Sequence, residues 1–219
     1  MNNLQKRIFT SFILFAVLLI CIFLNKYSFL ILVIIASVIS FFEFNNLVNK
    51  IWKKNKNLKN SINITCFFYL FFFTYSAYEL YKAGLNVTIF ILLICIFSDI
   101  GGYVFGKNIG GKKLTKISPN KTRSGSIGSF IFSIFPIIII NLLNIEHIQI
   151  ELNFTNILFS LFISLMCQLG DLFFSYFKRL NNKKNTGTLL PGHGGLLDRI
   201  DGLIIVLPIV YLIKIFGIY

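Results

Sequence analysis

Seven long apolar runs alternate with shorter polar segments along the chain. The runs cover residues 8–24, 28–44, 62–78, 87–103, 127–143, 154–175 and 203–218. An α-helix needs about 20 mostly apolar residues to cross the hydrocarbon core of a bilayer. A backbone in that core must satisfy its own hydrogen bonds, and the sequence lacks the alternating ten-residue segments of a transmembrane barrel. The pattern therefore predicts an all-α fold, a polytopic transmembrane helical bundle of about seven spans joined by polar loops.

The first run begins directly after Lys6 and Arg7, as the apolar part of a signal peptide does. We expect it to stay attached, because no small-residue cleavage site follows it and the next run begins at Ser28. The sequence contains no internal repeat, low-complexity linker or separate soluble domain. It predicts one integral membrane domain, residues 1–219, with N-terminal spans (1–97), a region that carries the polar motifs (98–201) and a last span (202–219).

Composition and charge indicate a membrane protein with a defined orientation. The 219 residues are 56% hydrophobic and 13% charged, with a mean hydropathy of +0.77, too apolar for a soluble domain of this length. A net charge of +13 would suggest nucleic acid as a partner of a soluble protein, but here the basic residues lie between spans. Eighteen of the 21 Lys and Arg residues fall on one side if the N-terminus is inside. The positive-inside rule thus predicts a multi-pass cell (inner) membrane protein with cytoplasmic polar loops, an external C-terminus and no nucleic-acid partner.

One polar stretch, residues 175–201, concentrates charged residues and glycines between two apolar runs. It contains Lys178, Arg179, Lys183 and Lys184, the turn Pro191-Gly192-His193-Gly194-Gly195, and the carboxylates Asp198 and Asp201. Glycines let backbone amides approach an anion, and a following helix N-terminus adds a favourable partial charge, so we predict that Gly194 and Gly195 bind phosphate. His193 either contacts that phosphate or orders the loop, and the sequence leaves both interpretations open. The stretch is typical of a site where a polyanion meets a metal at a membrane surface.

Four of the eight carboxylates lie at the predicted cytoplasmic ends of spans, namely Asp99, Asp171, Asp198 and Asp201. Asp99 and Asp171 fall near predicted helix C-termini, where the macrodipole disfavours negative charge, so each needs a compensating cation. Asp198 and Asp201 fall at the start of the last span, where helix capping is an alternative role. Their i, i+3 spacing nevertheless places both on one helix face, where they could join Asp171 in binding a hard cation such as Mg²⁺.

A second polar segment, residues 98–126, is rich in glycine and lysine. Its glycines lie at positions 101, 102, 106, 110 and 111, and its six basic residues run from position 107 to position 123. This composition suits a loop that cradles a triphosphate, although the Walker A pattern GxxxxGK(S/T) is absent from the sequence. Most of the lysines could act only as topology determinants. We predict a specific phosphate contact for Lys121, which lies beside Ser118 and Thr122.

Together these motifs resemble the signature of one enzyme family, the phosphatidate cytidylyltransferases (CDP-diacylglycerol synthases). The main residues that carry the resemblance are Ser175-x-Phe177-Lys178-Arg179, Lys184 and Pro191-x-His193-Gly194-Gly195-Leu196-x-Asp198-Arg199-Ile200-Asp201. Earlier motifs of the same family are similar to Ser98-Asp99, Gly106, Ser118-Pro119-x-Lys121-Thr122 and Gln168-x-Gly170-Asp171-Leu172. The resemblance covers residues 98–201, whereas the first three spans match the family only in being hydrophobic.

The chain departs from the family pattern at three places. The family usually has an acidic residue at the position of Phe174, Lys-Asp in place of Lys184-Asn185, and Trp-Glu-Gly in place of Arg123-Ser124-Gly125. The missing carboxylates are expected to weaken a metal or CTP contact. The chain is also short for the family, and we expect it to lack one or two of the family's N-terminal spans.

The resemblance implies transfer of a cytidylyl group from CTP to phosphatidate, which gives CDP-diacylglycerol and pyrophosphate. It implies CTP and phosphatidate as substrates, the lipid bilayer as a partner and Mg²⁺ as a cofactor, with a second cation and a homodimer left open. The predicted catalytic residues are Asp171, Asp198, Asp201, Lys178 and Arg179, and the three aspartates are the predicted Mg²⁺ ligands. The predicted substrate-binding residues are Ser98, Asp99, Ser118, Lys121, Thr122, Lys184, His193, Gly194, Gly195 and Arg199.

Two alternatives stay open at this point. The headgroup motifs do not distinguish acyl chains, so a cytidylyltransferase or kinase that acts on another lipid or polyprenol substrate is one of them. The other is a cation-binding membrane transporter, because membrane-embedded aspartates often mark ion paths. Against the transporter, the acidic residues gather at one face of the membrane, and Pro136 and Pro208 are expected to cause only ordinary kinks.

Overall fold

A computed structural model of the protein shows how the apolar runs fold. It describes residues 3–115, 117–119, 121–143 and 150–217. These residues form the helices α1 (Asn3–Leu24), α2 (Lys26–Ile51), α3 (Lys56–Ala83), α4 (Leu85–Asn108), α5 (Arg123–Ser133), α6 (Phe135–Leu142), α7 (Phe154–Leu180) and α8 (Leu197–Ile215). Within the described ranges, β pairing is limited to two isolated bridges. The predicted all-α fold is confirmed, and Ile218, where the seventh predicted run ends, lies outside the described residues.

Five of the seven predicted spans are helices long and apolar enough to cross a membrane. They are Gln5–Leu24 within α1, α2, α4, Arg123–Leu142 (which joins α5 and α6), and α7. The other two predicted spans form the helices α3, of 28 residues, and α8, of 19 residues. Their polar and charged residues keep both from meeting the same criterion of length and composition, so their crossing of the membrane stays a prediction. The apolar helices identify an integral membrane protein.

The fifth predicted run is broken into two helices near its middle. The helix α5 ends at Ser133 and α6 begins at Phe135, with Pro136 in the first turn of α6. Proline has no backbone N–H to donate to the carbonyl four residues earlier, and its ring clashes with that carbonyl. Pro136 therefore interrupts the run where only a kink was expected, whereas α8 continues through Pro208.

The helices extend further into polar sequence than the apolar runs predict, and three of these extensions concern the predicted site residues. The helix α4 ends at Asn108 rather than at residue 103, α7 ends at Leu180 rather than at 175, and α8 begins at Leu197 rather than at 203. Asp99 and Asp171 consequently lie more than two helical turns before the ends of their helices. The macrodipole acts mainly within the last turn, so the expectation that it disfavours these two carboxylates is wrong.

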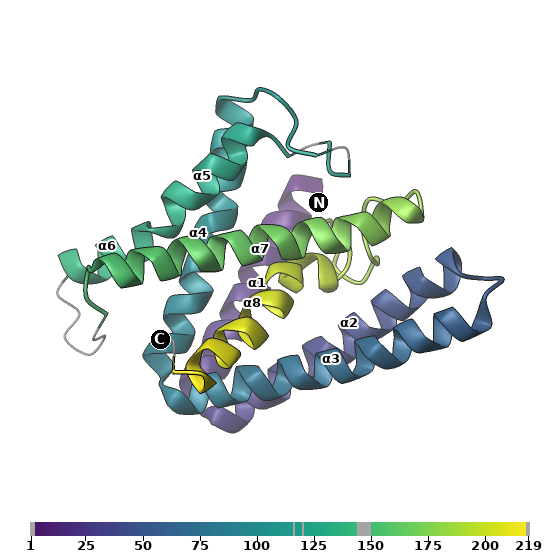
Figure 1. The fold of residues 1–219 in the computed structure, drawn as a ribbon, viewed down its shortest axis with the longest axis horizontal. Coiled ribbons are helices and arrows are strands. Elements are labelled where there is room, and N and C mark those ends of the chain that lie inside the picture. Colours follow the sequence, from purple (N-terminus) through teal and green to yellow (C-terminus); the bar gives the residue numbers. More distant parts are fainter. Residues whose placement is uncertain (1–2, 116, 120, 144–149, 218–219) are drawn as a thin grey trace.

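The helices pack mainly as neighbouring pairs along the chain. The helices α2 and α3 lie side by side as one long hairpin, α4 packs against α5, and α7 packs against α8 (Figure 1). In this view α7 runs across the middle of the molecule, with α5 above it and the α2–α3 hairpin below it, while α4 extends to both sides of α7. Fully buried isoleucines on α4, α7 and α8 (Ile94, Ile163 and Ile204) belong to the hydrophobic core that holds these helices together.

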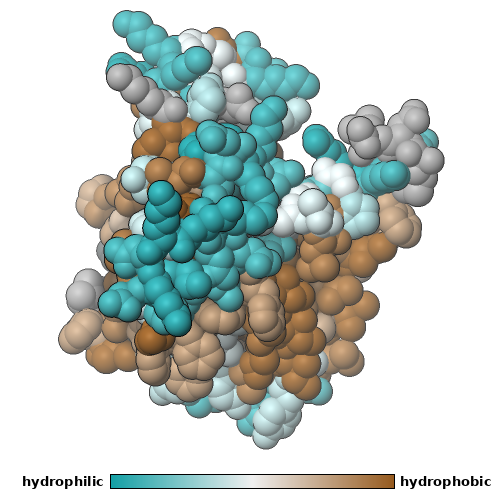
Figure 2. All heavy atoms as spheres, turned by 90° about the vertical axis from the view of Figure 1, so that its right-hand side faces the viewer, coloured by the Kyte–Doolittle hydropathy of each residue, from teal (hydrophilic) through white to brown (hydrophobic). Residues whose placement is uncertain are grey.

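Charged residues gather at the end of the molecule where α7 ends. Figure 2 views this end and shows hydrophilic residues over its middle, with hydrophobic residues below them. The exposed lysines here are Lys53, Lys54 and Lys56 of the α2–α3 connection and Lys183 and Lys184 after α7. The start of the α7–α8 connection contacts the end of α2, because Asn181 Nδ2 donates a 2.9 Å hydrogen bond to the carbonyl of Leu47. The ring of Trp52, in the α2–α3 connection, has its centroid 6.1 Å from that of Phe177 on α7. Two basic connections that the sequence assigns to the same side of the membrane thus lie together.

Glycine residues let α4 and α5 approach each other closely. A Cβ atom on Gly128 would lie 2.6 Å from the carbonyl oxygen of Gly101, and one on Gly102 would lie 2.6 Å from Ser129 Oγ. Small residues of this kind allow two membrane helices to pack backbone against backbone. Gly101, Gly102 and Gly106 all lie on α4, so the expectation that they belong to a loop is wrong.

We expect Gly128→Ala to lower the Tm of the purified protein in detergent by about 2–10 °C, because overpacking at a close contact costs about 1–3 kcal/mol. The matched control is Gly84→Ala, where the new Cβ would have Val87 Cγ2 at 3.6 Å as its nearest neighbour. The control should leave the Tm nearly unchanged. Equal Tm values for the two variants would contradict a tight α4–α5 crossing at Gly128.

Candidate active site

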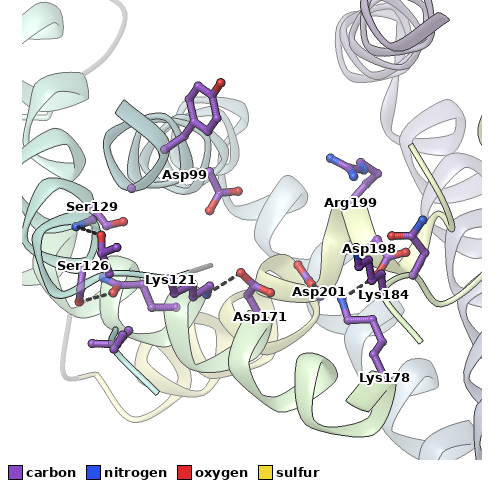
Figure 3. Close-up of a pocket in the computed structure, with 17 residues that line it drawn as sticks. Asp99, Lys121, Ser126, Ser129, Asp171, Lys178, Lys184, Asp198, Arg199 and Asp201 are labelled. Carbon is purple, nitrogen blue, oxygen red and sulfur yellow. Dashed lines mark hydrogen bonds and ion pairs between the residues drawn. The ribbon is translucent and has the colours of Figure 1, made fainter. Parts of the chain in front are cut away.

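A polar cavity of about 460 Å³ lies between α4, α5, α7 and α8 (Figure 3). Nine of the predicted site residues line it, namely Asp99, Lys121, Thr122, Asp171, Lys178, Lys184, Asp198, Arg199 and Asp201. They come from α4, the α4–α5 connection, α7, the α7–α8 connection and α8. Small-molecule sites typically measure about 300–1,000 Å³, so the cavity has room for a nucleotide or a lipid headgroup.

Lys178 forms a buried ion pair on the α7–α8 side of this cavity. Its Nζ lies 2.7 Å from Asp198 Oδ1 and 3.9 Å from Asp201 Oδ2. The side chains of Lys178 and Asp198 are only 8% and 6% exposed. The pair can form because α7 continues past Ser175, which places Lys178 on the helix rather than in the loop. A charge buried to this extent requires its partner, so the ion pair holds α7 and α8 in register.

Both carboxylate oxygens of Asp198 are already occupied by protein donors. Oδ1 accepts the bond from Lys178, and Oδ2 accepts hydrogen bonds from Thr186 N at 2.8 Å, Thr186 Oγ1 at 3.1 Å and Gly195 N at 3.1 Å. Asp198 lies in the first turn of α8, and its bond from Gly195 N is close to the capping role that the sequence left open. We conclude that Asp198 organises the α7–α8 connection.

The other three carboxylates of the cavity face one another from three helices. Figure 3 shows Asp99 of α4, Asp171 of α7 and Asp201 of α8 around the same space. Asp171 Oδ2 lies 2.5 Å from Lys121 Nζ, and Asp171 Oδ1 accepts a hydrogen bond from Ser175 Oγ at 3.2 Å. The charge of Asp171 also acts on both Asp99 and Asp201. Like charges this close favour the arrival of a cation.

The predicted Mg²⁺ site of three aspartates is not assembled. Among the residues that the structure describes, no group of three or more Asp, Glu, His or Cys side chains is arranged to hold a metal ion. Asp198 does not fit as a ligand, because its oxygens bind the buried Lys178 and the backbone N–H groups of Thr186 and Gly195. The partner of Asp171, by contrast, is the partly exposed Lys121, whose side chain can turn away. Asp171 and Asp201 do fit the chemistry of Mg²⁺, which in nucleotide sites is usually held by one or two carboxylates together with substrate phosphates.

The glycine-rich turn before α8 uses its backbone amides internally. The N–H groups of His193 and Gly194 donate to the carbonyl of Leu190, and that of Gly195 donates to Asp198. Gly194 has a φ of +91°, a left-handed conformation that favours glycine. The turn therefore does not present the amides of Gly194 and Gly195 to an anion, and it does not line the cavity. Its geometry supports a structural role in place of the predicted phosphate contact.

His193 points away from the cavity, toward α1. Its Nε2 lies 3.1 Å from Ser11 Oγ, and Arg7 Nε donates to the carbonyl of Gly192 at 2.8 Å. Arg199 Nη2 donates to the carbonyl of His193 at 3.0 Å. Burial lowers the pKa of His193, and the Arg199 and Arg7 guanidinium groups lower that pKa further. Of the two roles that the sequence left open for His193, the structure favours ordering of the loop.

Three further residues predicted for the site lie outside the cavity. Ser98 is fully buried, and its Oγ lies 2.8 Å from Ser164 Oγ on α7. Ser118 is buried in the α4–α5 connection, where its carbonyl accepts a hydrogen bond from the N–H of Lys121. Arg179 Nε donates to the carbonyl of Ile117 at 3.3 Å. These contacts link helices and loops around the cavity, so the three residues support the site from outside.

Two of the residues that depart from the family pattern, Phe174 and Asn185, lie in different surroundings. Asn185 lines the polar cavity. Phe174 is buried against Phe44 of α2, with ring centroids 6.0 Å apart, and lines a separate apolar pocket with Phe177. The absence of an acidic residue at Phe174 therefore concerns the packing of α7 against α2, whereas Asn185 bears directly on the polar cavity.

The cavity also contains polar residues that the sequence analysis did not single out. Ser126 and Ser129 of α5 line it together with Gln168 of α7, and Ser126 Oγ donates to Gln168 Oε1 at 2.6 Å. With Thr122, the two serines lie at i, i+4 and i+7 along the start of α5, which places them on one helix face. This spacing is a signal that could have identified them.

Glu43 of α2 is a further residue that the sequence analysis missed. Its side chain is buried and accepts hydrogen bonds from Thr186 and from the first residues of α8. Asp99, Asp171 and Glu43 are the carboxylates within the seven apolar runs. An ionisable residue at membrane depth is a functional signal, and that signal was available for Glu43.

Comparison with known proteins identifies the family of the chain. Phosphatidate cytidylyltransferases of Staphylococcus epidermidis and Staphylococcus aureus are 40% and 41% identical to the chain over 139 and 140 residues. Each alignment covers 63% of this chain and 52% of the relative, so the chain spans about half the length of the curated relatives it matches. The model of the cytidylyltransferase family matches residues 47–216, a range that includes every residue lining the polar cavity. The chain therefore belongs to the cytidylyltransferase family.

Proposed function

We propose that the protein transfers the cytidylyl group of CTP to phosphatidate and releases pyrophosphate. The observation that carries the proposal is the meeting in one cavity of four basic side chains (Lys121, Lys178, Lys184 and Arg199) and four acidic ones (Asp99, Asp171, Asp198 and Asp201). The Staphylococcus relatives are named phosphatidate cytidylyltransferases, which supports the same reaction for this chain.

The cavity suits a reaction between two polyanions. In this reaction an oxygen of the phosphatidate phosphate attacks the α-phosphorus of CTP, and the bond from that phosphorus to the oxygen shared with the β-phosphate breaks. The attacking phosphate is already anionic near neutral pH, so no strong general base is required. Catalysis then depends on neutralising charge and on holding the attacking and leaving oxygens in line.

We assign Asp171 and Asp201 as the residues that would hold Mg²⁺, with water and substrate phosphates completing its coordination. When bound, the cation would neutralise phosphate charge and favour departure of pyrophosphate. Lys121 pairs with Asp171 in the structure, and we expect it to turn toward a substrate phosphate on binding. Arg199 is exposed at the cavity and is our candidate for the lipid phosphate.

We propose that the cavity opens on the cytoplasmic face of the cell (inner) membrane. The basic residues predict this orientation by the positive-inside rule, and the contact of Asn181, at the start of the α7–α8 connection, with Leu47 near the end of α2 supports it. A cytoplasmic site has access to CTP, while the surrounding bilayer supplies the lipid substrate. The number of cations and a homodimer remain open within this proposal.

The test is an assay of the purified full chain with CTP, phosphatidate and Mg²⁺. We expect CDP-diacylglycerol and pyrophosphate in equal amounts, and no product when EDTA removes the cation. Parallel reactions with a polyprenol phosphate and with lysophosphatidate test the lipid specificity. Absence of CDP-diacylglycerol from folded protein, or faster reaction with another lipid phosphate, would contradict the proposal.

Lys184 offers a prediction about nucleotide binding that is separate from the chemical step. Its side chain is exposed and lines the cavity, whereas the neighbouring Lys183 is exposed and does not. A charged hydrogen bond to phosphate contributes about 1.5–3 kcal/mol, so Lys184→Gln should raise the KM for CTP about tenfold or more. The matched control Lys183→Gln should leave the KM unchanged. Equal KM values for the two variants would contradict the assignment of Lys184 to the CTP-binding site.

A further inference from the structure

The carboxylate of Glu43 binds a segment that lies far away in the sequence. Glu43 lies on α2 and is 8% exposed. Its Oε1 accepts a hydrogen bond from Leu196 N at 3.0 Å, and its Oε2 accepts bonds from Leu197 N at 2.9 Å and from Thr186 Oγ1 at 2.8 Å. All three donors belong to the α7–α8 connection or to the start of α8.

Glu43 serves as the N-terminal cap that α8 does not supply itself. The N-cap residue of α8 is Leu196, whose side chain makes no capping hydrogen bond. The first N–H groups of a helix have no partner within the helix, and they favour a negative charge because of the macrodipole. Glu43 satisfies two of these groups with one carboxylate from another helix.

The backbone around Glu43 is shaped to admit its carboxylate. A Cβ atom on Gly187 would lie 2.7 Å from Glu43 Oε1, and one on Gly195 would lie 2.7 Å from Glu43 Cδ. At both positions any residue larger than glycine would meet the carboxyl group. Two glycines on separate turns of the connection therefore leave room for this one side chain.

Thr186 links Glu43 directly to the charged side of the cavity. Its side-chain Oγ1 lies 2.8 Å from Glu43 Oε2 and 3.1 Å from Asp198 Oδ2, and its backbone N–H donates to the same Asp198 oxygen at 2.8 Å. Asp198 in turn binds Lys178 of α7. A short chain of contacts thus runs from Glu43 through Thr186 and Asp198 to Lys178.

We propose that Glu43 is a positioning residue, which fixes the start of α8 so that Asp198, Lys178 and Asp201 keep their places at the cavity. The proposal rests on the proposed function for its kinetic consequence. Glu43 itself does not line the cavity, so it acts through Thr186 and α8 rather than on substrate. It also lies outside residues 47–216, where the family match is found.

The structural part of the proposal is tested by hydrogen exchange on the full-length protein in detergent. In Glu43→Gln, the amide nitrogen that replaces one oxygen cannot accept a hydrogen bond. We expect the amides of residues 186–197 to exchange at least about tenfold faster, with no change in α4 or α5. The matched control is Glu79→Gln on α3, whose carboxylate pairs with Lys82 at 2.7 Å at the surface. Exchange in residues 186–197 that is unchanged in Glu43→Gln would overturn the proposal.

The kinetic part is tested with the cytidylyl transfer assay on the same proteins. We expect Glu43→Gln to lower kcat at least about tenfold while the KM for CTP changes less than about threefold, and Glu79→Gln to match the wild type. Thr186→Val, which removes only the linking hydroxyl, should lower kcat in the same way, whereas Thr186→Ser should restore it. These threonine variants decide the matter if Glu43→Gln fails to fold.

The two proposals can fail separately. Wild-type protein that makes no CDP-diacylglycerol contradicts the proposed function, while the exchange experiment still tests the position of α8. An active wild type whose kcat is unchanged in both Glu43→Gln and Thr186→Val overturns the positioning role alone.

Discussion

Replacing Asp201 with Asn is expected to lower kcat about 10³-fold without lowering the Tm, because the change removes a charge that acts on substrate rather than one that holds the fold. The Asp201 side chain is 14% exposed, and its Oδ2 is 3.9 Å from Lys178 Nζ, beyond hydrogen-bonding distance. It faces the like charges of Asp171 and Asp99. Asparagine keeps the size of the side chain and relieves this repulsion, so the folded protein should be as stable as the wild type or more so.

The matched variant is Asp198→Asn, which should behave differently. Asp198 receives four protein hydrogen bonds, including the one from buried Lys178, so the loss of its charge should cost about 1–3 kcal/mol and lower the Tm. Thermal unfolding in detergent and initial rates with CTP and phosphatidate measure both effects. Near-normal kcat in Asp201→Asn would contradict its assignment to the reaction, and an unchanged Tm in Asp198→Asn would contradict the organising role of Asp198.

The order of the long helices could be predicted from the sequence, because apolar runs of span length have few alternatives in a membrane, whereas the division of the fifth run into α5 and α6 could not. The ends of the helices were predicted less well. The helices α4 and α7 continue through Lys107 and Lys178, although charged residues usually mark the end of a span. The helix α7 continues because Lys178 faces the polar cavity inside the protein rather than lipid, whereas Lys107 at the end of α4 is exposed and does not line the cavity. The hydropathy of a segment does not show which side of a helix faces which surroundings.

Many of the residues that form the site could be predicted from the sequence, but the contacts between them could not. Eight of the charged residues between positions 99 and 201 line the cavity, because a membrane protein keeps such residues only where they are solvated or paired, whereas others such as Lys107, Arg179 and Lys183 lie outside it. Whether a given aspartate faces a ligand or a protein donor depends on its neighbours in space. Asp198 and Asp201 illustrate this, since they are one helical turn apart and make very different contacts.

The partners of the glycine-rich turn could not be found by any local pattern. They come from the first two helices, where Arg7 and Ser11 of α1 hold one side of the turn and Glu43 of α2 holds the start of α8. The sequence resemblance treated these helices as hydrophobic spans only. The structure gives them a second role, because the connection that leads into α8 contacts both of them.

Replacing Lys178 with Met should have the largest effect on stability. Methionine fills a similar volume but leaves the buried carboxylate of Asp198 without its cation, and breaking a buried pair in this way costs about 3–5 kcal/mol. For a protein of this size we expect the Tm in detergent to fall by about 6–20 °C. Activity should be lost as well, because Lys178 lines the cavity beside Asp201.

Lys121→Met provides the matched comparison, since it removes the same type of charge from the same cavity. The Lys121 and Asp171 side chains are 26% and 35% exposed, so water can solvate Asp171 after the change, and the cost should be about 0–1 kcal/mol. The double variant Lys178→Met with Asp198→Asn should regain part of the stability that Lys178→Met loses, because the carboxylate that Lys178 contacts at 2.7 Å is then no longer charged. Equal Tm losses in Lys178→Met and Lys121→Met, or no recovery in the double variant, would mean that the ion pair between α7 and α8 does not hold these helices in register.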